Sequence, residues 1–254
     1  MKQDYQELIE LAKIAARDAA RIISASREKF GKVQSVVLSG KETKIIADQV
    51  LDKIILDRLD NTGISVLSEE SGYLERNNTD GLLWIVDPLD GSLNFSRKSG
   101  PSAVSIALWK DMCPCFGVIY LLDEAKLAWG GSGFDAWLDQ KPIITSDRSE
   151  KKLATLCTGI PARFNSKDSK SVKKFTDVIF GFSKVRMIGS AACSLLLVAS
   201  GSADAYWEED IMLWDIAAGF AIVEGAGGRL RYECRSDSYQ CSAIAANPNL
   251  IEKL

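Results

Sequence analysis

The sequence predicts an α+β half with an antiparallel sheet, followed by an α/β half. Two stretches near the start carry apolar residues at helical spacing, five short apolar runs separated by turn residues follow, and strand and helix patterns then alternate. With 254 residues, 46% of them hydrophobic, the chain can bury a large core. The Ser- and Lys-rich stretch 145–152 marks the expected boundary between halves 1–145 and 146–254.

Two helices are expected first. Leu8, Leu11 and Ile22 recur at helical spacing within 4–29, and 44–59 shows a second helical pattern. The strand patterns that follow cover 64–68, 82–87, 102–109, 115–121 and 126–130. Turn signals rather than helices separate them, which favours an antiparallel sheet over β-α-β crossovers.

The second half alternates between strand and helix. Strands are expected at 153–158, 184–188, 203–207, 229–232 and 242–246, and helices at 170–180, 190–200 and 214–226. This alternation is the basis for expecting an α/β half.

An apolar run that ends in two carboxylates is the most informative feature. Residues 82–86 have strand length, and Pro88 is expected to end the strand because proline cannot donate to a ladder. Asp87 and Asp90 then lie three apart on a turn, close enough to bind neighbouring hard cations, with the Leu89 carbonyl as a further oxygen ligand. Taken alone, the segment is equally well explained as a surface turn.

The residues after Asp90 suit a phosphate. Gly91 allows a close backbone approach, and 91–93 is expected to open a helix whose free N–H groups favour an anion.

Two further acidic positions support a metal site. The strand at 64–68 ends at Glu69 and Glu70, and Asp215 lies at the start of an apolar, Ala- and Gly-rich helix. A lone Asp at that place is more often a helix cap than a ligand. Acidic residues at the ends of three strands or helices are nevertheless better explained by one shared metal cluster than by three unrelated turns or caps.

These segments resemble the signatures of the inositol monophosphatase family, within the superfamily of lithium-sensitive, magnesium-dependent phosphatases. The matching segments, in the family's order and spacing, are 69–72, 87–95 and 214–219, supported by 41–48, 158–161, 186–192 and 246–248. Ser92 stands where threonine is usual in the family, and both side chains supply a hydroxyl.

The resemblance implies a layered α-β-α-β-α sandwich with the active site between the two halves, and two to three Mg²⁺ ions. One ion would be held by Glu69, Asp87 and the Leu89 carbonyl, and a second by Asp87, Asp90 and Asp215. Glu69 and Glu70 would help to hold a weaker third ion.

The resemblance also implies residue roles. Ser92, hydrogen-bonded toward Asp48 with Thr43 nearby, would orient or deprotonate the attacking water. Residues assigned to catalysis are Thr43, Asp48, Glu69 and Ser92, and residues assigned to substrate binding are Asp90, Gly91, Ser92, Ser190, Ala191, Glu208 and Asp215. Without the resemblance, Asp48 reads as a solvated helix carboxylate and Glu208 as part of an acidic cluster that serves a helix N-terminus.

Composition excludes several alternatives. The chain has no histidine, which removes Ser-His-Asp and Cys-His catalysis and most catalytic zinc sites. With a net charge of −3, the chain has no excess of basic residues that would indicate nucleic-acid binding. The six cysteines form no C-x-x-C pair and are expected to be buried, reduced thiols, with a redox role of Cys113 and Cys115 left open.

The chain is expected to be cytoplasmic and not bound to a membrane, because it has no apolar signal core and no run of ~20 apolar residues. The resemblance implies a homodimer. Residues 93–95, Leu-Asn-Phe, resemble inositol-type members, whereas bisphosphate nucleotidases place Lys-Glu-Phe there. Inositol 1-phosphate is therefore the expected substrate, ahead of fructose 1,6-bisphosphate, histidinol phosphate and 3′-phosphoadenosine 5′-phosphate. An interaction protein of RNA-processing or transcription complexes is the alternative from another class.

Overall fold

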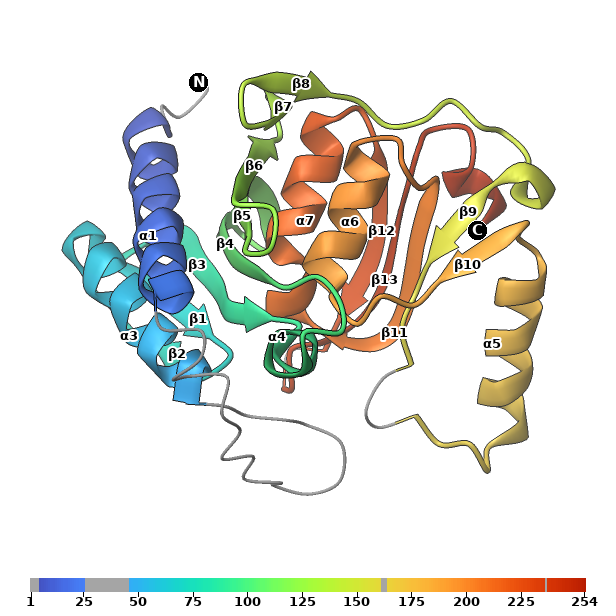
Figure 1. The fold of residues 1–254 in the computed structure, drawn as a ribbon, viewed down its shortest axis with the longest axis horizontal. Coiled ribbons are helices and arrows are strands. Elements are labelled where there is room, and N and C mark those ends of the chain that lie inside the picture. The colour runs from blue at the N-terminus through green and yellow to red at the C-terminus, as the bar shows by residue number, and fades with distance from the viewer. Residues whose placement is uncertain (1–4, 26–45, 161–163, 236) are drawn as a thin grey trace.

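The chain is arranged in five layers, helix, sheet, helix, sheet and helix, in a computed structural model that describes residues 5–25, 46–160, 164–235 and 237–254 (Figure 1). This confirms the layered sandwich that the family resemblance implies.

Within the described residues, the first sheet has eight strands in the order β2-β1-β3-β4-β5-β6-β7-β8. The strands are β1 (Ile64–Ser68), β2 (Gly72–Leu74), β3 (Asn78–Asp90), β4 (Ala103–Lys110), β5 (Cys113–Leu121), β6 (Lys126–Gly131), β7 (Phe134–Leu138) and β8 (Lys141–Ile143). Helices α1 (Gln6–Ala25) and α3 (Ile46–Leu59) cover its outer face. Small alanines at Ala12, Ala16 and Ala19 form the buried stripe of α1, which allows close packing on the sheet.

Two expectations about this sheet are corrected. β3 does not end at Pro88 but continues to Asp90, and its pairing with β4 is irregular between Asp87 and Asp90. A residue that donates no hydrogen bond is tolerated at such an irregularity. The sheet is also not wholly antiparallel, because β1 and β3 pair in parallel. The short strand β2 separates them along the chain, and β2, β7 and β8 were not predicted.

The second sheet has five strands in the order β10-β9-β11-β13-β12. The strands are β9 (Thr155–Cys157), β10 (Lys184–Arg186), β11 (Ala205–Met212), β12 (Arg229–Cys234) and β13 (Gln240–Ala246). Helix α5 (Ser169–Phe180) covers the outer face, where the Phe175 ring lies 5.9 Å from the Trp207 ring. Every predicted element of this half is present, within two residues at each end except for β11, which continues five residues beyond the predicted 207.

Helices α6 (Ala191–Ala199) and α7 (Leu213–Gly225) fill the layer between the sheets (Figure 1). Both consist mainly of buried apolar residues, as expected for helices packed between two sheets, and the charged residues of α7, Asp215 and Glu224, lie near its ends. Gly219 permits close packing of α7 on α6, because a Cβ there would lie 2.5 Å from the Leu195 Cβ. Gly117 of β5 does the same for the sheet, since its Cβ would lie 2.2 Å from the Ala218 carbonyl oxygen.

The expectation of reduced cysteines is wrong for two of the six. Cys234 and Cys241 form a disulfide, because the antiparallel register of β12 and β13 places them opposite each other. Of the free thiols, Cys115, Cys157 and Cys193 are buried as expected, whereas Cys113 is exposed, so the expectation of burial is wrong for it.

Among helices of the described residues, none combines the length and apolar character that a membrane crossing needs.

Candidate metal centre and adjoining pocket

Three carboxylates from two layers of the fold converge at one point. Asp87 and Asp90 lie at the irregular end of β3, and Asp215 lies in the first turn of α7. One oxygen from each can be chosen so that all lie within 4.8 Å of one another. The structure thus brings together three of the predicted metal ligands.

Asp87 is fully buried in this group. Its Oδ1 accepts a hydrogen bond from the Leu89 N–H at 3.0 Å, whereas its Oδ2 has no hydrogen-bond donor among the described residues. Burial raises the pKa of Asp87 well above its usual range, and the negative charges of Glu69, Asp90 and Asp215 raise it further. A bound cation would supply the missing partner and remove the repulsion.

Glu69 directly follows β1, and its N–H donates to the Val86 carbonyl of β3 at 3.1 Å. This backbone bond places Glu69 beside the end of β3, close enough to raise the pKa of Asp87 and Asp215. Glu70 is half-buried, and its N–H lies 3.4 Å from Ser68 Oγ. Among the described carboxylates, neither glutamate belongs to the group within 4.8 Å.

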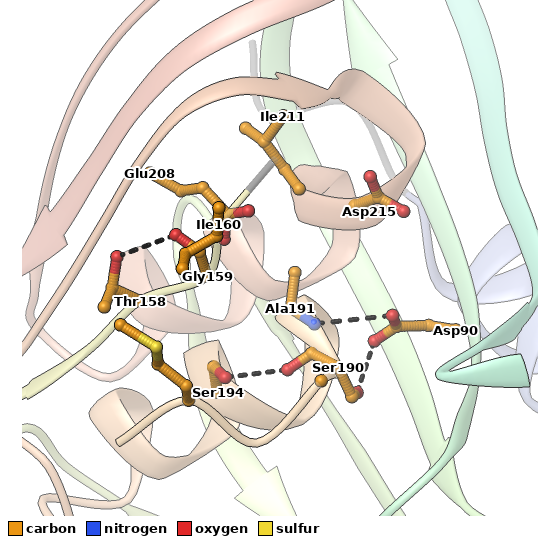
Figure 2. A pocket seen from close by; sticks show the side chains of 12 residues that line it. Asp90, Thr158, Gly159, Ile160, Ser190, Ala191, Ser194, Glu208, Ile211 and Asp215 are labelled. Atoms are coloured by element: carbon orange, nitrogen blue, oxygen red, sulfur yellow. Dashed lines mark hydrogen bonds between the residues drawn. The ribbon is translucent and has the colours of Figure 1, made fainter. Parts of the chain in front are cut away.

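Asp90 is held by the start of α6. Its carboxylate accepts hydrogen bonds from Ser190 Oγ and from the Ala191 N–H at 3.3 Å (Figure 2). It also accepts one from the Ala192 N–H at 2.8 Å. Burial raises the pKa of Asp90 to about 6, although these donors lower it. Ser190 and Ala191, which were expected to contact substrate, therefore also position Asp90 and connect the two halves of the chain.

Asp215 acts as a helix cap and also lies where a metal ligand is predicted. Its Oδ2 accepts the Met212 N–H at 3.2 Å, which caps the start of α7. Its carboxylate also lies in the acidic group, where burial, followed by the charges of Glu69, Asp90 and Glu208, raises its pKa well above the usual range.

The predicted hydrogen bond between Ser92 and Asp48 is present. Ser92 Oγ lies 2.9 Å from Asp48 Oδ1 and 2.9 Å from the Leu89 carbonyl oxygen, and its single proton can serve only one of them at a time. Asp48 is buried on α3, at 4% exposure, so it is not a solvated helix carboxylate. Thr43 lies outside the described residues.

Gly91 precedes the short helix α4 (Ser92–Arg97), as expected. It has a φ of 83°, and a Cβ there would lie 2.9 Å from the Pro101 carbonyl oxygen. A side chain at this position would therefore be strained and would collide with the backbone.

A pocket of about 310 Å³ adjoins Asp90 and Asp215 (Figure 2). Its lining residues are Asp90, Thr158, Gly159, Ile160, Met187, Gly189, Ser190, Ala191, Ser194, Glu208, Ile211 and Asp215. Glu208 lies on β11, buried, and accepts a hydrogen bond from the Tyr206 hydroxyl at 2.8 Å. Burial raises the pKa of Glu208 to about 7, which the Tyr206 hydrogen bond partly offsets.

Three positioning residues were missed from the sequence. Tyr206 orients Glu208 from two residues away on the same strand. Gly159 makes room for Glu208, because a Cβ there would lie 2.6 Å from Glu208 Oε1. Asn94 Nδ2 donates to the Pro101 and Ile188 carbonyls at 2.9 and 2.7 Å, which connects α4 to the loop before α6. Asn94 and Gly159 lie within segments 87–95 and 158–161, which resemble the family, whereas Tyr206 lies in none of the matching segments.

Comparison with known proteins agrees with this geometry. A family model described as the Inositol monophosphatase family matches residues 4–254. An inositol-1-monophosphatase of Synechocystis sp. is 33% identical over 248 residues, covering 95% of this chain and 82% of the relative. A fructose-1,6-bisphosphatase/inositol-1-monophosphatase of Aquifex aeolicus is 31% identical over 230 residues, covering 89% and 86%.

A relative named Nus factor SuhB, from Xylella fastidiosa, is 32% identical over 216 residues, covering 84% of this chain and 78% of the relative. Among solved structures, the extragenic suppressor protein suhB of Bartonella henselae has a TM-score of 0.84 at 28% identity, covering 98% of this chain and 96% of that one.

Proposed function

The chain belongs to the inositol monophosphatase family and is therefore a phosphomonoesterase, and we propose that it hydrolyses the phosphate monoester of a small polyol, inositol 1-phosphate foremost. The observation that carries the proposal is the convergence of Asp87, Asp90 and Asp215 beside a polar pocket. We expect the protein to act in the cytoplasm as a homodimer.

The residues present fit Mg²⁺. The donors are all oxygen, which hard cations prefer, and Asp87 Oδ2 is buried without a donor among the described residues. Glu69, Asp87 and the Leu89 carbonyl would hold one ion, and Asp87, Asp90 and Asp215 another, with Glu69 and Glu70 toward a third. When bound, the ions would neutralise phosphate charge, lower the pKa of a water molecule and stabilise the leaving oxygen.

The protein's own groups would orient the reactants. Ser92 Oγ would accept a hydrogen bond from the attacking water while donating its own proton to Asp48, and Thr43 is expected to assist. Since Asp48 and Leu89 compete for the one Ser92 proton, donation to Asp48 leaves the Leu89 carbonyl available as a ligand. The free N–H groups of Gly91 and Ser92 would hold the phosphate.

The pocket favours a polyol over a second phosphate. Glu208, Thr158 and Ser194 offer oxygen atoms to hydroxyl groups, whereas the described residues that line the pocket include no Lys or Arg. A second phosphate, as in fructose 1,6-bisphosphate or 3′-phosphoadenosine 5′-phosphate, needs cationic partners when it is buried. A volume of about 310 Å³ suits a ligand of the size of a single sugar ring.

The similarity to Nus factor SuhB proteins supports a second candidate, a role in an RNA or transcription complex. The carboxylate group weighs against a purely structural role, because three acids placed together, two of them buried and one half-buried, are costly without cations.

A phosphate-release screen tests the proposal. The panel contains inositol 1-phosphate, fructose 1,6-bisphosphate, histidinol phosphate and 3′-phosphoadenosine 5′-phosphate, each with Mg²⁺ and with excess chelator. We expect release from inositol 1-phosphate only with Mg²⁺, and inhibition by Ca²⁺ and Li⁺. Full activity in chelator would reject the metal mechanism, a preference for the adenosine bisphosphate would reject the polyol assignment, and no hydrolysis of any ester would favour the interaction role.

A further inference from the structure

A second cavity, about 660 Å³ in volume, lies between α1 and the β6–β8 part of the first sheet. It shares no lining residue with the pocket beside the carboxylates. α1 lies on the outer face of the first sheet, whereas α7, the helix that contains Asp215, lies in the helical layer on the opposite face (Figure 1). The cavity is therefore separate from the proposed catalytic centre.

Positive charge is concentrated around this cavity although the chain as a whole carries a net charge of −3. Lys13 and Arg17 reach it from one face of α1, and Lys126 and Lys141 reach it from the starts of β6 and β8. Among the described residues that line the cavity, Asp139 is the single carboxylate, and its Oδ1 accepts the Leu127 N–H at 3.0 Å.

Two of the four cations are already partnered within the protein. Lys13 Nζ lies 2.8 Å from Glu10 Oε1 and 3.7 Å from the centre of the Trp129 ring, and Lys126 Nζ lies 2.7 Å from Glu124 Oε2. Lys13 is thereby held in place at 8% exposure.

Arg17 and Lys141 are different, since neither makes an ion pair with any described residue. Both are exposed, on opposite sides of the cavity, one on the helix and one on the sheet. Two unpaired cations match a phosphate monoester, which carries nearly two negative charges at neutral pH, better than a carboxylate, which carries one. The planar Arg17 guanidinium can also bind two phosphate oxygens at once.

Apart from Gln140, the other described residues that line the cavity are apolar. Leu127, Trp129 and Leu138 contribute side chains to the cavity, so a bound anion could bury an apolar body beside its charged group. We propose that this cavity binds a small organic phosphate, with the phosphate between Arg17 and Lys141 and the organic part against Leu127 and Leu138.

Calorimetric titration with phenyl phosphate in chelator tests the proposal. Without divalent cations the carboxylate group repels anions and supports no hydrolysis, so the cavity is the expected binding site. We expect 1:1 binding with a dissociation constant below about 1 mM, and at least tenfold weaker binding of inorganic phosphate, benzoate and phenol. Absence of saturable binding, or equal affinity for phosphate and phenyl phosphate, would overturn it.

The double variant Arg17→Gln/Lys141→Gln should lose about a hundredfold or more in affinity, since each of the two charge-assisted contacts accounts for about a factor of ten or more. The matched control is Lys170→Gln/Lys184→Gln, which removes two exposed lysines that do not line the cavity. Unchanged binding in the first pair, or equal losses in both pairs, would overturn the assignment.

Two further measurements distinguish the loss of this binding site from a general loss of structure. Mg²⁺-dependent phosphatase activity of Arg17→Gln/Lys141→Gln should equal that of the parent, because neither residue lies at the proposed catalytic centre. The charge-preserving pair Arg17→Lys/Lys141→Arg should keep binding within a few-fold, and a complete loss in that pair would contradict a charge-based site.

Discussion

Replacing Asp87 by Asn should stabilise the metal-free protein while abolishing turnover. The carboxylate oxygens of Asp87, Asp90 and Asp215 can lie within 4.8 Å, where two ionised groups repel by about 3 kcal/mol at an effective dielectric constant of about 20. Proton uptake by Asp87, whose pKa is raised, already relieves part of this cost. The Asn oxygen can keep the Leu89 N–H bond, and its amide nitrogen can donate toward the neighbouring carboxylates.

The expected gain in the free energy of unfolding is therefore about 1–3 kcal/mol, or about 3–10 °C in Tm, at neutral pH in chelator. The Mg²⁺-induced rise in Tm of the parent should be lost in Asp87→Asn, and kcat should fall more than about tenfold, a loss above ~1.4 kcal/mol. Differential scanning calorimetry with and without Mg²⁺, together with phosphate release, measures all three quantities.

The exposed carboxylate Asp135 offers a matched control, because Asp135→Asn removes the same charge away from the cluster. It should change neither Tm nor kcat. A lower metal-free Tm for Asp87→Asn would refute the repulsion argument. A variant that keeps more than a tenth of kcat, or the full Mg²⁺ stabilisation, would refute a role for Asp87 between two cations.

Three further outcomes are expected. Ser92→Ala should lower kcat far more than it raises KM while Ser92→Thr stays active, because the hydroxyl acts mainly in the transition state. Steady-state kinetics measure both constants, and a normal kcat for Ser92→Ala would mean that Ser92 serves the helix structure instead. Glu208→Gln should lower turnover of inositol 1-phosphate about tenfold or more but leave that of p-nitrophenyl phosphate unchanged, because a charge-assisted hydrogen bond to the polyol contributes roughly 1.5–3 kcal/mol. Equal losses on both esters would mean that Glu208 has a structural role. In chelator, Tm should fall as pH rises from 5 to 8. The folded protein releases the Asp90 and Glu208 protons near pH 6 and 7, whereas the unfolded chain releases them at lower pH, so the folded state loses relative stability over this range. A constant or rising Tm would contradict these raised pKa values.

Local patterns were sufficient for the existence and type of most elements. The apolar spacing in α1 and the alternation of the second half depend on neighbours a few residues away, and these predictions are confirmed. Which strands pair with each other was harder to predict from the sequence, because pairing and register depend on contacts between distant segments. The parallel pair β1–β3, the continuation of β3 through Pro88 and the Cys234–Cys241 disulfide all depend on which strands become neighbours.

The sequence by itself determined the chemistry available to this protein. With no histidine and with acids at the ends of three apolar segments, oxygen ligands and hard cations are the predictable outcome. Only the tertiary structure decided which of these groups meet. Asp90 is held by the start of α6, a hundred residues away, and burial rather than residue type raises the pKa of Glu208. The packing of the fold likewise brings lysines and an arginine of α1 and of the β6–β8 region around one cavity. In the sequence these residues look like ordinary surface charges, because proximity between layers is set by packing and leaves no local pattern.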